Sequence, residues 1–561
     1  MAWPRDGLGL RSRRSSPSPY LSSHSPSLFS RSSTSLRLPK WRLANLFRWR
    51  LLRLVATFFL CAALLRIVMV PFRRPQVPDY GPYLTHNAVL DPAVIDGGRQ
   101  KLVIILPIDK PLHDLCKVVS SAVALGYPPP VLVNFRKEFH TGKAGVGPSH
   151  LAKVAGTLEF LDHALANETA EADRLNDDDL VIMLDALDIW FQLPPEVLLH
   201  RYYAVLEAAS KRVEVESGFS DPSWMRQKIV VAAQKPCHGP RDDISDLHCD
   251  KAPESTLPDD IYGMFTDSLL MEIRWKWKRP RYLNSGSFMG PARDMRNFFI
   301  RVQEKLDRAE EMHANLGGDQ AVFGEVFGEQ EQWRRELQAL HSEGDWTAER
   351  KKGREQDKWD FGLTLDYTQE LFYPTSYSEH DGGFRVLSDK EAELQRAGGT
   401  SDMEDAKSPL AQLKNIPKAD LNMGRLSLFG DSWTGAVPAI LHHNAWRFGL
   451  ARRRKTWWDK MWYFPYLRRL LEFSLDNKRE MKPLATFPAN NGSLEVWPYG
   501  AEKEDSRKSS FILEMKNEPP TLRPAGWAEI CTFDDTAKEE LAPWYEEVFQ
   551  DDGGPLKVSS G

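Results

Sequence analysis

The chain has 561 residues, and its 73 Lys plus Arg against 78 Asp plus Glu give a formal charge of only -5. Residues 1–50 hold ten basic residues and one acidic residue, which leaves a charge of -14 on the rest of the chain. An acidic remainder excludes a general nucleic-acid binder, because such binding depends on clustered Lys and Arg. Five cysteines without a CxxC pair exclude a disulfide scaffold and a cysteine-based zinc site.

The N-terminal region predicts a membrane anchor. Residues 1–50 are Ser-, Pro- and Arg-rich, which is typical of a disordered cytoplasmic tail, and residues 54–70 are nearly all apolar. A buried core helix or a cleaved signal peptide is the alternative, but arginines crowd the N-terminal side and no small-x-small cleavage site follows. By the positive-inside rule we expect a single-pass type II protein of the endoplasmic reticulum or Golgi membrane, with residues 71–99 as a luminal stem.

Residues 100–450 predict an α/β domain with a mostly parallel sheet. Short apolar runs alternate with helical patterns, and runs without polar alternation indicate strands buried on both faces. Strands are expected at 102–106, 131–135, 180–184, 228–233, 282–289 and 439–442, and the first helices at 112–125 and 149–165. Ligands are then expected beyond the carboxyl ends of the strands.

Two further features lie outside this pattern. Residues 451–561 form a C-terminal extension, whose basic and aromatic start could lie on a membrane surface or pack its tryptophans onto the domain. Cys237 and Cys249 flank a polar loop and are the expected disulfide of a luminal domain, with two free thiols as the alternative.

The strand at 180–184 runs directly into Asp185 and Asp188. Two carboxylates three residues apart at the end of a buried strand are hard oxygen ligands, suited to hold Mg²⁺ or Mn²⁺ against a substrate diphosphate. Capping of the next turn or helix is the alternative use of an aspartate at this place.

Five motifs follow one another in an order found in a known family. They are Asp-x-x-Asp at 185–188, Tyr-Leu-Asn-Ser-Gly at 282–286, Asp-Gln at 319–320, Leu-Asp-Tyr at 365–367 and His-x-Asn at 442–444. This order resembles the glycosyltransferase domain of the procollagen lysyl hydroxylases and the related collagen galactosyltransferases, as a divergent, fungal-type relative. Over residues 101–450 the resemblance implies a GT-A (Rossmann-like) fold that uses a UDP-sugar and Mn²⁺ or another divalent cation.

The resemblance also implies roles for individual residues. The metal ligands become Asp185, Asp188 and His442, with His443 as the alternative if the register slips by one. A neutral imidazole beside two carboxylates suits Mn²⁺ better than Mg²⁺ or Ca²⁺.

Donor binding is assigned to four further residues. Asn284, Ser285 and Gly286 are expected to contact the sugar, unless they form a plain turn, and the glycine permits close backbone approach. Lys153 follows a Gly-rich loop at 142–147 and could reach a phosphate, although a solvated lysine is the alternative.

Catalysis is assigned to Asp319, facing the acceptor or sugar, with Gln320 as its neighbour; the alternative for Asp319 is a helix N-cap. The relatives carry a run of several aspartates before the glutamine. This chain has Gly-Gly-Asp at the same place, so it has a single carboxylate there. Asp366 matches a segment of the relatives for which we expect a structural role.

These observations predict a luminal, metal-dependent glycosyltransferase that moves a hexose from a UDP-sugar to a glycoprotein or glycan acceptor. The alternative is a catalytically weak or inactive GT-A-fold binding or scaffold protein of the secretory pathway. A metal-dependent phosphodiesterase would need a second cluster of His and Asp ligands, which the motifs do not offer. No histidine follows His443, so we expect no iron-oxygenase activity of the kind that the lysyl hydroxylases carry.

Overall fold

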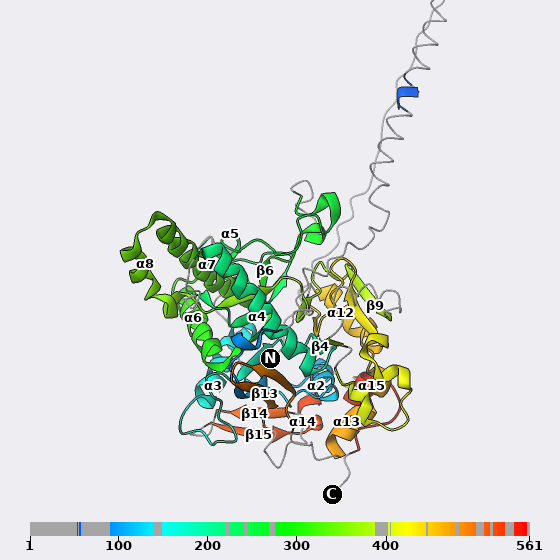
Figure 1. Ribbon diagram of the computed structural model, residues 1–561. Helices are drawn as coiled ribbons and strands as arrows, with labels where there is room; N and C mark the ends of the chain where they lie inside the picture. The colour runs from blue at the N-terminus through cyan, green and yellow to red at the C-terminus, as the bar shows by residue number, and fades with distance from the viewer. Residues whose placement is uncertain are drawn as a thin grey trace, which may run out of the picture. The chain divides into compact units, whose positions relative to one another are not determined.

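The computed structural model divides into two compact units, residues 1–74 and 75–561 (Figure 1). Only residues 53 and 55–57 of the first unit are described. In the second unit the structure describes 90–137, 148–218, 225–240, 245, 247–268, 275–386, 402–403, 406–444, 447–476, 482–500, 510–515, 520–532 and 543–557. The expected tail at 1–50 and residues 71–89 of the expected stem therefore lie outside the described residues.

A ten-stranded sheet forms the centre of the second unit, with its main path in the order β15-β14-β2-β1-β3-β6-β5-β7. Its N-terminal strands are β1 (Gly98–Pro107), β2 (Val131–Val133), β3 (Leu180–Leu184), β5 (Ile229–Gln234), β6 (Tyr282–Pro291) and β7 (Leu363–Asp366). The remaining four are β12 (Ala485–Ala489), β13 (Gly492–Pro498), β14 (Ser510–Glu514) and β15 (Thr521–Ala525), of which β13 pairs with β1 and β12.

The expected fold class needs correction. β1 pairs in parallel with β2, β3 and β13, but β6 lies antiparallel between β3 and β5, so the sheet is mixed and not mostly parallel. The transmembrane helix expected at 54–70 is not supported either. Among the described residues no helix is both long enough and apolar enough to cross a membrane, and residues 54 and 58–70 lie outside them.

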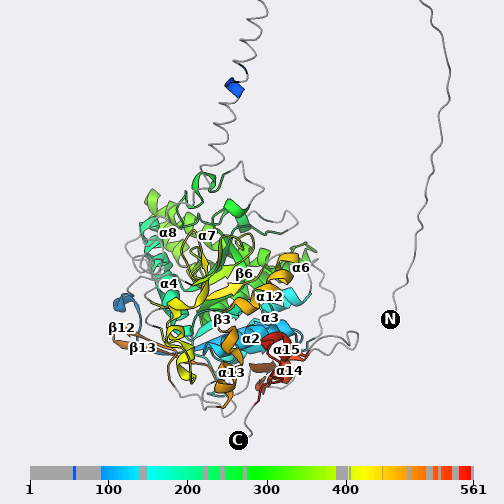
Figure 2. The same cartoon turned by 90° about the vertical axis from the view of Figure 1, so that its right-hand side faces the viewer.

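Helices cover both faces of the sheet (Figure 2). One apolar core packs α2 (His113–Ala124), α4 (Pro195–Ser217) and α13 (Leu467–Asp476) on one face. The other packs α3 (Pro148–Ala164), α6 (Ala292–Glu311) and α7 (Asp319–Glu343). Along β1, Leu102, Ile104 and Leu106 enter the first core while Val103 and Ile105 enter the second. This alternation across a strand explains why the run is apolar at every position.

Smaller elements complete the unit. A three-stranded sheet has the order β4-β11-β8, formed by β4 (Ile189–Phe191), β8 (Phe372–Pro374) and β11 (Ile440–His442), and β9 (Gly382–Val386) pairs with β10 (Ser427–Asp431). The other helices are α5 (Leu247–Asp250), α8 (Trp346–Gly353), α9 (Gln356–Trp359), α12 (Arg447–Thr456), α14 (Trp527–Cys531) and α15 (Trp544–Phe549). Short 3-10 helices lie at Pro92–Val94, Gly263–Phe265, Trp275–Trp277, Pro409–Gln412, Lys418–Leu421, Met423–Arg425, Trp458–Lys460 and Phe464–Tyr466.

The segment after residue 450 is part of the same compact unit. It supplies four strands of the main sheet, and its Trp458 and Trp462 are buried, with indole N–H groups that donate to the carbonyls of Val548 and Gln192. Of the two alternatives for its aromatic start, these contacts agree with packing onto the domain.

Two disulfides cross-link the described part of the chain. Cys237–Cys249 is the expected pair, and Cys116–Cys531 joins α2 to α14 across 415 residues of sequence. The second pair was not expected, because nothing in the sequence separation indicates that these helices meet.

We predict that the Cys116→Ser/Cys531→Ser double variant loses about 2–5 kcal/mol of unfolding free energy, because the bridge closes a very long loop in the unfolded chain. Thermal unfolding and non-reducing peptide mapping check this. The matched control, Cys237→Ser/Cys249→Ser, opens a loop with a separation of only 12 and should lose less. Alkylation of Cys116 without reductant would contradict the pairing.

Candidate metal centre

The antiparallel ladder between β3 and β6 brings two of the sequence motifs together. In this ladder Leu184 lies opposite Ser287, and one step further the amide of Asp185 donates to the carbonyl of Gly286 at 2.9 Å. The carboxyl end of β3 therefore lies beside the amino end of β6. Residues 185 and 284–286 meet although about a hundred residues separate them.

A second ladder brings in the late histidine. β4 pairs antiparallel with β11, with Ile189 opposite His442, and the amide of His443 donates to the carbonyl of Asp188 at 2.7 Å. The turn from β3 to β4 carries both aspartates, so the two ladders place Asp185, Asp188 and His442 around one point.

These three residues form a group that could hold a metal ion, with one ligand atom from each lying within 4.8 Å of the others. Nε2 of His442 lies 3.6 Å from Oδ2 of Asp185 and 3.5 Å from Oδ1 of Asp188. Ligand atoms that each lie about 2.1 Å from a shared ion are separated by about 3–4 Å, so the spacing fits. The Asp185 side chain is 34% exposed, which leaves the group open to solvent on that side.

The hydrogen bonds of His442 agree with a ligand role. The ring is 1% exposed, its Nδ1 lies 3.0 Å from Oδ1 of Asn284, and its Nε2 has no hydrogen-bond partner among the described residues. An amide oxygen can only accept, so Nδ1 carries a proton, and Nε2, which faces the two carboxylates, is the ring nitrogen that could bind a metal ion. Metal-binding histidines are oriented in the same way by a partner on the other ring nitrogen.

Gly286 makes room for this ring. A Cβ at position 286 would lie 2.1 Å from Cε1 of His442 and 2.8 Å from Oδ2 of Asp185, closer than real Cβ contacts come. The glycine of the Asn-Ser-Gly motif is therefore required by the metal group, and not by a turn, since it lies within β6.

His443 is not a ligand in this arrangement. Its ring is fully buried and lies 4.0 Å from the ring of Trp190, and it does not belong to the group of three side chains whose ligand atoms lie together. Burial lowers the pKa of His443 well below its ordinary value, so the ring stays neutral in the core. The geometry favours His442 over the alternative register.

Lys153 links two of the acidic side chains. Its ammonium group, on α3, donates to Oδ1 of Asp185 at 2.9 Å and to the carbonyl of Ser285 at 3.0 Å, and it pairs with Oδ2 of Asp319 at 2.5 Å. Burial lowers the pKa of Lys153, but Asp185 and Asp319 raise it by more, so the pKa lies above its ordinary value. All three N–H groups are used, and the Gly-rich loop at 142–147 lies outside the described residues.

Asp319 and Gln320 lie at the start of α7, beside the metal group. Gly318 is the N-cap of this helix, and Asp319, its first residue, accepts a hydrogen bond from Oγ of Ser285 at 2.9 Å. Gln320 accepts from Nδ2 of Asn284 at 3.3 Å, while its own buried Nε2 has no hydrogen-bond partner among the described residues.

The electrostatics keep Asp188 ionised. Burial raises the pKa of its carboxyl, but the His442 ring and the Arg454 guanidinium lower it by more, so the pKa lies below its ordinary value. Asp185, Asp188 and Asp319 against Lys153 leave this site acidic, which favours a divalent cation.

Two residues of the site received no role from the sequence. Gln234, the last residue of β5, is 1% exposed and accepts from Nδ2 of Asn284 at 2.8 Å and from Nδ2 of Asn444 at 3.3 Å. Gln234 is the first polar residue after an apolar run, so the rule for carboxyl ends of strands could have found it. Asn444 belongs to the His-x-Asn motif, and its Oδ1 also accepts a hydrogen bond from the amide of Ser376 at 2.9 Å.

Asp366 has the structural role that we expect. Its carboxylate is 1% exposed and accepts hydrogen bonds from the amides of Glu370, Leu371 and Phe372 at 2.8–3.1 Å. These bonds hold the turn between β7 and β8.

No family model matches this chain, and no curated protein matches it significantly. The resemblance suggested by the motif order therefore stays a prediction.

We predict that Asp188→Asn and His442→Gln each weaken Mn²⁺ binding at least about tenfold, because each removes one of three protein ligands. Isothermal titration calorimetry on the full chain measures this. The matched control is Asp177→Asn, since Asp177 lies on the exposed surface and pairs with Arg293. Equal Mn²⁺ affinity in all four proteins would contradict the metal centre.

A pH dependence follows from Asp366. Burial raises the pKa of its carboxyl to about 7, above the ordinary value of 3.8. The folded chain thus holds this proton more tightly than the unfolded chain, and the stabilisation is complete below pH 3.8 and lost as pH rises through 7. Relative to Asp366→Asn, which cannot ionise, the unfolding free energy of the wild type should fall between pH 4 and 8. Urea titrations at several pH values measure both unfolding free energies. If the two values change with pH in parallel, the predicted ionisation of Asp366 is contradicted.

Proposed function

We propose that this protein is a metal-dependent glycosyltransferase that transfers a hexose from a UDP-sugar to a hydroxyl of a glycoprotein or glycan. The observation that carries the proposal is the group of Asp185, Asp188 and His442, with the carboxylate of Asp319 held beside it through Lys153 and Ser285. A cation can offset charge on a departing diphosphate, and a separate carboxylate can accept a proton from a hydroxyl, so this pair of groups suits transfer from a sugar diphosphate.

Asp185, Asp188 and His442 would hold the cation, for which Mn²⁺ is the proposed ion because one nitrogen joins the oxygen ligands. When bound, the ion would act as a Lewis acid that offsets negative charge on the departing diphosphate. Three protein ligands leave coordination positions for diphosphate oxygens.

The chain's own residues would orient the reactants. Lys153 fixes Oδ1 of Asp185, so that Oδ2 faces His442. A direct phosphate contact from Lys153 would require one of its three hydrogen bonds to be exchanged. Asn284 holds the His442 ring, and Ser285 holds Asp319.

Asp319 and Gln320 are the proposed contacts to the reacting sugars. Asp319 is 13% exposed and ionic, and could accept a proton or hydrogen bond from a hydroxyl. The buried Nε2 of Gln320, which has no partner in the described part of the chain, could donate to a sugar oxygen.

The proposed compartment is the lumen of the endoplasmic reticulum or the Golgi. Two disulfides in the described residues support an oxidising environment, because cytosolic thiols are kept reduced.

A UDP-release assay over a panel of UDP-hexoses tests the proposal. With Mn²⁺ present the full chain should release UDP from at least one donor, EDTA should abolish the release, and Asp188→Asn should lower it at least about a hundredfold. Asp177→Asn should match the wild type.

The competing function is a binding or scaffold protein. It is favoured by the single carboxylate at Gly-Gly-Asp and by the engagement of that carboxylate, Asp319, with Lys153. UDP that binds in calorimetry without any Mn²⁺-dependent release from the donor panel would support this reading and overturn the transferase.

A further inference from the structure

Two asparagines of the chain begin the acceptor triplet for N-linked glycosylation, Asn-x-Ser/Thr with x other than proline. The triplets are Asn-Glu-Thr at 167–169 and Asn-Gly-Ser at 491–493. Such short triplets also arise by chance, and a chance triplet can lie anywhere in a fold. A glycan is bulky and needs an asparagine at the surface, so the position in the structure separates an acceptor from a chance match.

The first triplet lies in an exposed turn. Asn167 and Glu168 are exposed, and they follow the end of α3 at Ala164 by only a few residues. Thr169 is 7% exposed, and its hydroxyl donates to the carbonyl of His163 at 2.5 Å. In the folded chain the threonine therefore holds the turn, while the asparagine is left in solvent.

The second triplet begins in the turn of a β-hairpin. Asn490 and Asn491 connect β12 to β13, and residues 491–493 are all exposed. Oδ1 of Asn491 accepts a hydrogen bond from the amide of Gly97 at 3.0 Å, whereas its Nδ2 donates to no described residue. Because an N-linked glycan is attached to Nδ2, it is compatible with the hydrogen bond that the oxygen makes.

α3 separates Asn167 from the metal centre. Near the start of this helix Lys153 contacts Asp185, and the helix ends at Ala164, roughly 16 Å further on at a rise of 1.5 Å per residue. The chain then turns to enter β3, and the amide of Leu175 donates to the carbonyl of Ala164. Asn167 therefore lies toward the amino end of β3, whereas the metal centre lies at its carboxyl end.

The hairpin turn lies at the same edge of the sheet. β13 runs parallel to β1, and Gly98, the first residue of β1, pairs with Leu494. Asn491 precedes this pair and contacts Gly97, so it lies at the amino end of β1, which is parallel to β3. Glycans on both asparagines would thus leave the carboxyl ends of the strands, and with them the metal centre, open to substrates.

We propose that Asn167 and Asn491 carry N-linked glycans. In this modification Nδ2 of the asparagine attacks C1 of an oligosaccharide that is joined to a lipid diphosphate. The new bond from Nδ2 to C1 replaces the bond from C1 to the diphosphate oxygen, and the amide gives up one proton as the lipid diphosphate leaves. The inference rests on the proposed luminal compartment, which the two disulfides also support, and not on the proposed transferase activity.

The test is expression of the full chain in a eukaryotic secretory host, followed by peptide-N-glycosidase treatment in heavy-oxygen water and peptide mapping. The glycosidase converts a glycosylated asparagine to an aspartate that carries heavy oxygen, so the peptides with Asn167 and Asn491 should both be marked. Asn167→Gln and Ser493→Ala should each migrate one step faster on a denaturing gel, and the double variant should migrate as the glycosidase-treated wild type does. Ser493→Ala removes the second triplet while the hydrogen bond from Gly97 to Asn491 stays.

Asn176→Gln is the matched control, because Asn176 is an exposed asparagine outside any triplet, and it should migrate as the wild type does. Thr169→Ser keeps both the triplet and the hydroxyl, so it should keep its glycan.

The outcomes that contradict the proposal are distinct. Unmarked asparagines in a protein whose disulfide-bonded cysteines resist alkylation would overturn the glycosylation and leave the compartment standing. Unmarked asparagines together with alkylation of those cysteines would overturn both, and a mark on only one asparagine would overturn the assignment of the other. None of these outcomes bears on the metal centre, which the UDP-release assay tests separately.

Discussion

The site depends on one feature of the sheet, the antiparallel strand β6 between β3 and β5. In a wholly parallel sheet, all strands would end at the same edge and only carboxyl ends would meet. Because β6 runs the other way, its first residues lie where β3 and β5 end. Asn284, Ser285 and Gly286 thereby meet Asp185 from one neighbour and Gln234 from the other. The register shift between Val231 and Ala233 places residues 284–287 of β6 opposite the single residue Ala232 of β5, so β6 bulges where its Asn-Ser-Gly segment lies.

Hydrogen bonds from neighbouring side chains hold the proposed metal ligands and Asp319 in position at this meeting point. Asn284 fixes the tautomer of His442, and Lys153 takes one oxygen of Asp185 and one of Asp319. Lys153, Asp185 and Asp319 are thus paired with one another, which is the condition under which charges persist away from water. The Nε2 atoms of His442 and Gln320 have no hydrogen-bond partner among the described residues, and both are suited to meet a ligand.

The edges of the sheet serve different purposes. On one side, β14 and β15 extend the sheet beyond β2, and the Cys116–Cys531 bridge ties the following helix α14 to α2. The segment after residue 450 is therefore integral to the same layers as the motifs before it.

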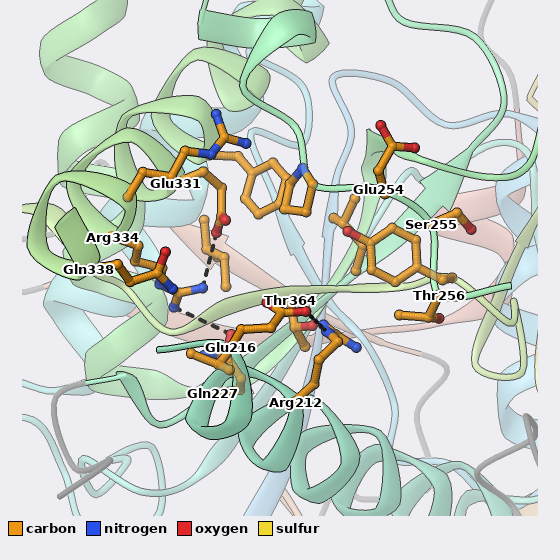
Figure 3. A pocket seen from close by; sticks show the side chains of 17 residues that line it. Arg212, Glu216, Gln227, Glu254, Ser255, Thr256, Glu331, Arg334, Gln338 and Thr364 are labelled. Carbon is orange, nitrogen blue, oxygen red and sulfur yellow. Dashed lines mark hydrogen bonds and ion pairs between the residues drawn. The ribbon is translucent and has the colours of Figure 1, made fainter. Parts of the chain in front are cut away.

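On the other side, α4 and α7 pass beyond β7 and enclose a cavity of about 340 Å³ there (Figure 3). The side chain of Gln330 hydrogen-bonds the amide and carbonyl of Leu363, so the exposed backbone of this edge strand is satisfied by a side chain and not by another strand.

The sequence by itself determined the local elements and the chemical types at the strand ends. Apolar runs indicated β1, β2 and β3, the helical patterns indicated α2 and α3, and the position of Asp185 and Asp188 after β3 indicated a cation site. It could not determine the direction of β6, because an apolar strand has the same alternation whichever way it runs. Nor could it pair Cys116 with Cys531 or choose His442 over His443, since both depend on which element lies alongside. Those choices, together with the roles of Gln234 and the cavity beside β7, were decided by the tertiary structure, because contacts between distant segments follow from packing and strand pairing that no local pattern encodes.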